Sequence, residues 1–285
     1  MARPSYEDVW TFANSLQHVS QEARSMFLKG VEQISFDDWS VSVQQLRDLV
    51  NVVMDSFGPA AAELGAQWYE YCRAGKFDRG YTAIVGETSR YSVKSDVDAA
   101  VDKLFDGDIT ENDLIDKVAG IIVNQVQAQS KNSILENLDE DLRQARAAND
   151  KEFGAQCGYS RVTTSGACAF CILLASRGFV YTSKQSAQLT KYGRKYHDDC
   201  RCVPVPFTDA HSIPGYGGQL ADHEQKYRDA DNLRRSGDYP DELKERINQA
   251  REQHKAAYAE GLTNEKWSSL NEDLIIMRWQ NEGMS

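Results

Sequence analysis

The sequence predicts a mainly α protein: long helical arms, a small α+β zinc-knuckle module with a short β-ribbon, and C-terminal helices. Three observations predict this class. Apolar residues recur at three- and four-residue steps through much of the first 150 residues. Cysteine, glycine and β-branched residues gather in the middle, and charge-rich helical stretches follow. We therefore divide the chain into a helical N-terminal region (1–154), a Cys/His module (155–208) and a helical C-terminal region (209–285).

The first amphipathic helix is expected to kink or break at Gly58-Pro59, because proline removes an internal hydrogen bond. A second helical piece is expected from Ala60 to Arg73. Its Cys72, apart from the other cysteines, is expected to be a buried packing residue. The apolar face of the first helix carries Val43, Leu46, Leu49, Val50, Val53 and Phe57.

A longer helix is expected from Thr110 to about Asn149. Thr110-Glu-Asn-Asp113 resembles a capping box, in which an acid at the fourth position faces back to the cap. The stretch Gln125–Asn132 is polar on most faces. Such polarity suits a helix that contacts partners, or one that packs through a single narrow stripe.

The central module contains five soft metal ligands. Cys168-Ala-Phe-Cys171 offers two thiolates from one tight turn, and His197-Asp-Asp-Cys200-Arg-Cys202 follows. Zinc prefers four tetrahedral ligands of this kind, and a site with four protein ligands is structural. Cys200 and Cys202 are separated by one residue, so both could bind the same ion only with strained geometry. Cys202 is therefore the alternative to Cys200 as a ligand. We expect a structural Zn²⁺ bound by Cys168, Cys171, His197 and Cys200. The alternatives are unmetallated thiols or a disulfide between the two cysteine pairs.

Two segments of the module have the composition of strands. Gly178–Thr182 is rich in β-branched and aromatic residues, and the prolines of Val203–Phe207 favour extended backbone. We expect these segments to pair as a small ribbon beside the metal. The module is too small to bury a core alone, so a bound ion would supply folding energy.

Three sequence blocks resemble a known family. They are Cys168-Ala-Phe-Cys171, Ala175-Ser-Arg-Gly-Phe-Val-Tyr181 and Tyr196-His-Asp-Asp-Cys-Arg-Cys202, and the helix at 60–73 adds to them. The order and spacing of these blocks resemble the minor head proteins of tailed bacteriophages, the Mu F-like family, and especially its branch in phages of actinobacteria. The likeness covers about residues 40 to 210.

The resemblance implies a structural virion component at the portal vertex. Its partners would be the portal protein, the major capsid protein or both, and it would act in head assembly, DNA packaging or DNA ejection. It would lie in the capsid interior or at the portal vertex. The resemblance also implies structural roles for Arg177, Gly178 and Tyr181: the arginine would bond carbonyls or a carboxylate such as Asp198 or Asp199, and the tyrosine would pack on the module.

Composition agrees with such a component. Hydrophobic residues make up 41% and charged residues 26% of the 285 residues, which are ordinary values for a folded protein. No apolar run approaches the roughly 18–20 residues of a membrane span, so no membrane partner is expected. The start lacks the apolar stretch of a secretory signal. Synthesis and retention in the host cytoplasm would keep the thiols reduced, which favours metal over disulfide.

The charge is unevenly distributed. The net charge is −11, which argues against wholesale coating of nucleic acid. Residues 155–208 carry a net charge of +5, so the rest of the chain carries −16. This basic module could contact packaged DNA weakly and without sequence preference, although a solvated face is the simpler interpretation. The candidate DNA contacts are Arg161, Lys184, Lys191, Arg194 and Lys195.

After a connector at 208–221, three helices are expected at about 222–235, 239–258 and 264–282. The last is amphipathic, and we expect it to dock on the protein's own core, with anchoring to a capsid or portal partner as the alternative. Its apolar side carries Trp267, Leu270, Leu274, Ile275, Arg278 and Trp279.

An enzyme is not expected. The His-x-Glu of zinc deaminases, the His-Glu-x-x-His of zincins and the Gly-x-Ser-x-Gly of serine hydrolases do not occur. The alternative function is a metal-dependent hydrolase or nuclease with an incompletely filled zinc shell. His211 is the nearest candidate for its second histidine. Four protein ligands on the ion would favour the structural role. Three protein ligands and one water molecule would favour the hydrolase or nuclease.

Overall fold

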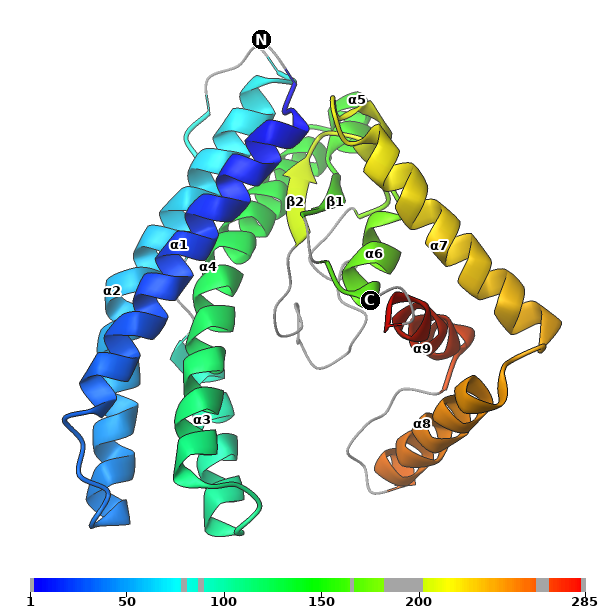
Figure 1. Ribbon diagram of the computed structural model, residues 1–285. Helices are drawn as coiled ribbons and strands as arrows, with labels where there is room; N and C mark the ends of the chain where they lie inside the picture. The colour runs from blue at the N-terminus through cyan, green and yellow to red at the C-terminus, as the bar shows by residue number, and fades with distance from the viewer. Residues whose placement is uncertain are drawn as a thin grey trace.

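The computed structural model describes residues 3–77, 81–86, 90–164, 167–181, 202–259 and 267–282. Within these ranges the protein is mainly helical with one two-stranded antiparallel sheet, as expected (Figure 1). No helix in the described ranges is long and apolar enough to cross a membrane. The elements are α1 (Tyr6–Val31), α2 (Trp39–Ala74), α3 (Arg90–Phe105), α4 (Glu111–Ala147), α5 (Lys151–Gln156), β1 (Tyr159–Thr163), α6 (Ala169–Ala175), β2 (Cys202–Pro206), the 3₁₀ turn η1 (Ala210–Ser212), α7 (Gly217–Ser236), α8 (Asp241–Ala259) and α9 (Ser269–Glu282).

Three long helices, α1, α2 and α4, run side by side and form the body of the protein (Figure 1). At 37 residues, α4 is about 55 Å long. The helices α2 and α4 approach closely at Gly65, where an added Cβ would lie 2.1 Å from the Ser130 carbonyl oxygen. Gly65 therefore sets the distance between these two helices.

A kink or a break was expected at Gly58-Pro59; α2 continues through Pro59, so the helix is not broken there. Proline removes one backbone hydrogen bond. Burial of the turns on either side offsets that loss, because Met54 and Ala61 are almost completely inaccessible. Cys72 is buried near the end of the same helix, as expected.

The start of α4 is confirmed as a capping box. The Thr110 hydroxyl accepts from the Asp113 backbone N–H at 3.3 Å, and the Asp113 carboxylate accepts from the Thr110 N–H at 2.9 Å. The polar stretch of this helix packs inside the protein, since Gln129, Ser130 and Lys131 are all buried.

The ribbon is present, but its strands are not the pair that the sequence predicted. β2 pairs with β1, with Tyr159 opposite Pro206 and Thr163 opposite Cys202. Tyr181, from the expected partner segment, makes only an isolated bridge to Tyr159. Composition does not separate the two candidate segments, since both contain aromatic and β-branched residues; β1 is the segment whose five residues are all buried.

The ribbon docks on the helical body. The indole N–H of Trp68 donates to the Pro204 carbonyl at 2.9 Å. Side chains of both strands belong to the same hydrophobic cluster as the helices, namely Tyr159, Val162, Val203 and Val205. We call this cluster the first core. The division at residues 154 and 208 stays a prediction.

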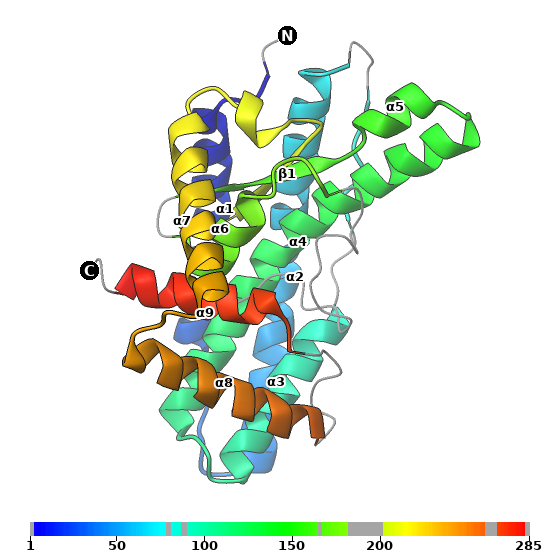
Figure 2. The same ribbon diagram turned by 90° about the vertical axis from the view of Figure 1, so that its right-hand side faces the viewer.

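A second hydrophobic cluster, the second core, lies on the side of the ribbon away from α1 and α2 (Figure 1). There α6 packs against α7 and α9, α8 packs against α9, and Figure 2 shows α8 and α9 crossing the direction of α7. The helix α9 packs on this core through Ile276 and Met277. Trp267 and Trp279 are partly buried beside them, so α9 docks on the protein itself, as expected.

Candidate metal centre at the cysteine module

The Cys-x₂-Cys motif forms the start of α6. Cys168 is the N-cap residue, and its sulfur accepts from the Cys171 backbone N–H at 3.5 Å. Cys168 is exposed and Cys171 is fully buried. The two thiols are thus presented from one tight turn, as the spacing predicts.

Cys202 joins this pair from β2. It is buried and packs against Cys171 in a small cluster of its own. Arg161, on the neighbouring strand, donates to the Cys202 sulfur from Nε at 3.2 Å and from one terminal nitrogen at 2.9 Å. These two contacts fix the position of the Cys202 sulfur beside the start of α6. Three sulfurs of the right chemistry for zinc therefore come from two elements.

The remaining expected ligands, His197 and Cys200, lie outside the described residues, as do Lys184, Lys191, Arg194 and Lys195. In the described part of the chain, no three His, Cys, Asp or Glu side chains are arranged to hold an ion by themselves. No disulfide joins two described cysteines. A complete zinc site would need a ligand from residues 182–201.

Arg161 is not available to DNA. Its side chain is fully buried and is bonded to Cys202, so its role is inside the module. The prediction that Arg161 contacts DNA assumed an exposed side chain, because arginine is usually exposed. A buried arginine requires a partner, and only the fold brings Cys202 beside it.

The structure describes the glycine and the tyrosine of the block Ala175–Tyr181, to which the family resemblance gives structural roles. Gly178 has a φ of +67°, which glycine adopts without strain. The Tyr181 hydroxyl donates to the Leu174 carbonyl at 2.7 Å, and its ring stacks on Tyr159 at 5.2 Å. Burial raises the pKa of Tyr181 to about 12, so it stays protonated. Arg177 is exposed, and its expected partners Asp198 and Asp199 lie outside the described residues.

The short helix α6 touches all three hydrophobic clusters, which sequence reasoning missed. Leu174 belongs to the first core and Cys171 to the cysteine cluster. Ala169, Ile172 and Leu173 belong to the second core. A run of apolar residues after Cys171 was the only signal for this junction. The cysteine module therefore lies where the helical body meets the C-terminal helices.

A buried polar cluster attaches α7 to β1. The Thr163 hydroxyl lies 2.6 Å from Nε2 of His223 and 3.1 Å from the Tyr216 hydroxyl. A hydroxyl beside an imidazole resembles a nucleophile and its base. However, Thr163 is inaccessible and His223 only 4% exposed, so this pair has no access to a substrate. Burial lowers the pKa of His223, which keeps the ring neutral.

His211 lies between two carboxylates on the surface. Its Nδ1 is 3.0 Å from Asp209, and its Nε2 is 2.8 Å from Glu224 of α7. The hydrogen bond with Asp209 is the main cause that raises the pKa of His211. Both ring nitrogens are thus engaged, and the histidine links η1 to α7.

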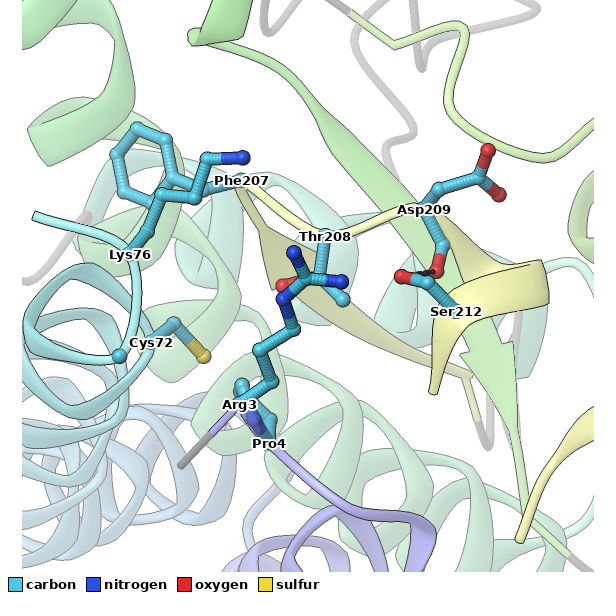
Figure 3. Close-up of a pocket in the computed structure, with 9 residues that line it drawn as sticks. Arg3, Pro4, Cys72, Lys76, Phe207, Thr208, Asp209 and Ser212 are labelled. Atoms are coloured by element: carbon cyan, nitrogen blue, oxygen red, sulfur yellow. Dashed lines mark hydrogen bonds between the residues drawn. The ribbon is translucent and has the colours of Figure 1, made fainter. Parts of the chain in front are cut away.

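A cavity of about 230 Å³ opens near the end of α2 (Figure 3). None of its lining residues belongs to the expected metal ligands. The lining residues are Arg3, Pro4, Cys72, Gly75, Lys76, Phe207, Thr208, Asp209 and Ser212.

Comparison with known proteins identifies one family. The family model described as VG15 protein matches residues 3–230. No curated protein and no solved structure matches the chain. The match indicates a viral protein of phage type, which supports the phage resemblance at that level but does not identify the Mu F-like family. Because the match covers most of the 285 residues, the chain belongs to the VG15 protein family.

Proposed function

We propose that this protein is a structural minor component of a phage head, bound at the portal vertex and acting in head assembly and in DNA packaging or ejection. Its partners are the portal protein, the major capsid protein or both. The VG15 family match supports a viral protein, and the cysteine-containing sequence blocks supply the more specific likeness to minor head proteins.

The position of α6 is the observation that carries the structural role. One seven-residue helix beside the cysteines contributes side chains to both hydrophobic cores and to the cysteine cluster. Residues with metal-binding chemistry thus lie at a junction between two packed regions. Such a junction is where a structural ion is most effective, since it cross-links elements that are distant in sequence.

Zn²⁺ is the ion we propose, held by Cys168, Cys171, His197 and Cys200, with Cys202 as substitute. When bound, it would join the start of α6 to the segment that precedes β2. Arg161 would hold the Cys202 sulfur in place beside the site through its two contacts with that sulfur.

Metal removal tests this site. The purified protein is expected to carry about one zinc per chain, and chelation should lower its thermal stability. Cys171→Ser should lower the bound zinc, whereas Cys72→Ser, on α2 in the first core, should leave zinc content unchanged. The zinc proposal would be contradicted if the purified protein contained no metal and its melting temperature did not change when chelator was added.

Phage assembly tests the function itself. Particles made without this protein should form shells but package or eject DNA poorly. Antibody labelling or mass spectrometry of purified virions should find a few copies per particle, inside the capsid or at the portal vertex. Full infectivity of particles that lack the protein would contradict the proposal, as would its absence from virions.

Contact with packaged DNA is a secondary part of this proposal. The basic residues Lys184, Lys191, Arg194 and Lys195 would neutralise phosphates weakly and without sequence preference. Binding of a short duplex should therefore weaken steeply with salt. A salt-independent affinity, or one that survives replacement of these four residues by glutamine, would contradict this contact.

A further inference from the structure

The cavity in Figure 3 lies where three distant segments meet. Arg3 and Pro4 come from the segment before α1, and Lys76 follows the end of α2. The third wall is the turn after β2, from Phe207 to Ser212. The volume of about 230 Å³ exceeds that of a single water molecule several-fold, so the cavity has room for a small ligand.

Two positively charged side chains line this cavity, and neither is paired with an acid that the structure describes. The side chains of Arg3 and Lys76 form no ion pair or hydrogen bond with any residue that the structure describes. The one acid in the lining, Asp209, is already engaged: its Oδ1 accepts from the backbone N–H of His211 and contacts the ring nitrogen, each at 3.0 Å. Figure 3 shows the Asp209 carboxylate directed away from Arg3. The described lining residues therefore carry an excess of positive charge.

The rest of the lining is uncharged. Pro4 and Phe207 are buried, and burial raises the pKa of the Cys72 thiol, so it stays neutral. The hydroxyls of Thr208 and Ser212 donate to the carbonyls of Pro206 and Asp209. The buried residues Cys72, Phe207 and Thr208 form one poorly solvated wall of the cavity, whereas the side chains of Arg3 and Lys76 are exposed at its opening.

Backbone geometry gives a second, independent observation. Phe207 has a φ of +59°, in the left-handed region that an aromatic residue seldom adopts. Its ring is held by edge-on contacts with Tyr69 at 5.5 Å and Phe77 at 5.1 Å, and its N–H donates to the Gly158 carbonyl at 2.8 Å. Non-glycine residues in this conformation concentrate at ligand sites, where the surrounding structure maintains them.

We propose that this cavity binds a phosphoryl group between Arg3 and Lys76. A phosphate monoester carries nearly two negative charges at neutral pH, so it compensates both cations, whereas a single carboxylate compensates only one. The guanidinium fork matches phosphate oxygens in pairs, and the lysine ammonium adds a point charge. The phosphate can come from free inorganic phosphate or from the end of a DNA strand.

Thermal unfolding of the full chain tests the proposal. Inorganic phosphate, titrated against chloride at constant ionic strength, should raise the melting temperature in a saturable way. Arg3→Gln and Lys76→Gln should each weaken the apparent affinity by about ten-fold, because each removes a charge-assisted bond. Both side chains are exposed, so the variants should fold.

The control variant is Lys29→Gln. Lys29 is also an exposed lysine near the end of a long helix, but it lines no part of this cavity. It should respond to phosphate as the unmodified protein does. An equal loss in Lys29→Gln would show that cations at helix ends, rather than the cavity, cause the effect, and would overturn the proposal. Absence of saturable stabilisation would overturn it as well.

A second arm identifies the source of the phosphate. A short DNA strand with a 5′-phosphate is compared with the same strand ending in a 5′-hydroxyl. A DNA end is supported as the ligand if the phosphorylated strand binds at least about ten-fold more tightly and if Arg3→Gln abolishes this difference. Equal binding of the two strands, together with a saturable response to inorganic phosphate, supports free phosphate. This outcome is independent of whether the protein is found in virions.

Discussion

The two hydrophobic cores of this protein are held together by different interactions. In the first core, the Asp141 carboxylate is inaccessible and accepts from Tyr69 at 2.7 Å and from Arg73 at 2.8 Å. In the second core, the ion pair between Arg234 and Asp273 leaves the arginine 21% exposed. Breaking a buried pair leaves an uncompensated charge, whereas a partly solvated pair is replaced by water.

The cores also differ in extent. Among the residues that the structure describes, the second core has eight buried hydrophobic side chains, while the first core continues through α1, α2, α4 and the ribbon. The family match ends at residue 230, within α7, so α8 and α9 lie beyond it. We therefore expect the C-terminal helices to open without unfolding of the helical body, because local stability follows local burial.

The largest expected effect comes from removing the buried carboxylate. Asp141→Ala leaves the Arg73 guanidinium in the first core without its anion. We expect the free energy of unfolding to fall by about 3–5 kcal/mol, measured by urea denaturation. The matched change in the second core, Asp273→Ala, should cost about 1–3 kcal/mol. Equal losses for the two variants would contradict the difference between the cores.

Two neighbouring leucines of α6 sharpen the comparison. Leu173 packs in the second core and Leu174 in the first, and both are almost completely buried. Each leucine-to-alanine change should cost about 2–3 kcal/mol, because it leaves a cavity. Hydrogen exchange should distinguish the two variants. Leu173→Ala should speed amide exchange in α8 and α9, whereas Leu174→Ala should also speed exchange in α1, α2 and α4. The same exchange pattern in both variants would show that the cores unfold together.

The smallest expected effect depends on pH. The hydrogen bond to Asp209 is the main cause that raises the pKa of His211 above its ordinary value of 6.5. The protonated ring therefore stabilises the link from η1 to α7 below pH 6.5, and this contribution is lost as pH rises through the higher folded pKa. Solvent screening keeps it under about 1 kcal/mol.

Thermal unfolding between pH 6 and 8.5 checks this effect. The unmodified protein should lose a small part of its stability over that range, and His211→Gln should lose less. A variant with the same pH dependence as the unmodified protein would assign the loss to other groups.

Much of the secondary structure follows from local chemistry. The Thr110 capping box forms as expected, because its hydrogen bonds join residues three positions apart. The Cys168–Cys171 pair begins a helical turn, because its spacing is also local. Of the kink or break expected at Gly58-Pro59, the break does not occur, since a proline weakens a helix by a finite amount that packing on both sides can exceed.

By itself, then, the sequence determined a mainly helical chain with a sulfur-rich module and a likeness to phage proteins. Only the tertiary structure decided that β1, rather than the segment at 178–182, pairs with β2. It also placed Arg161 against Cys202, and α6 between the two cores. The physical reason is range: caps and helical periods depend on neighbours in sequence, whereas strand partners and buried charge pairs depend on residues that only folding brings together.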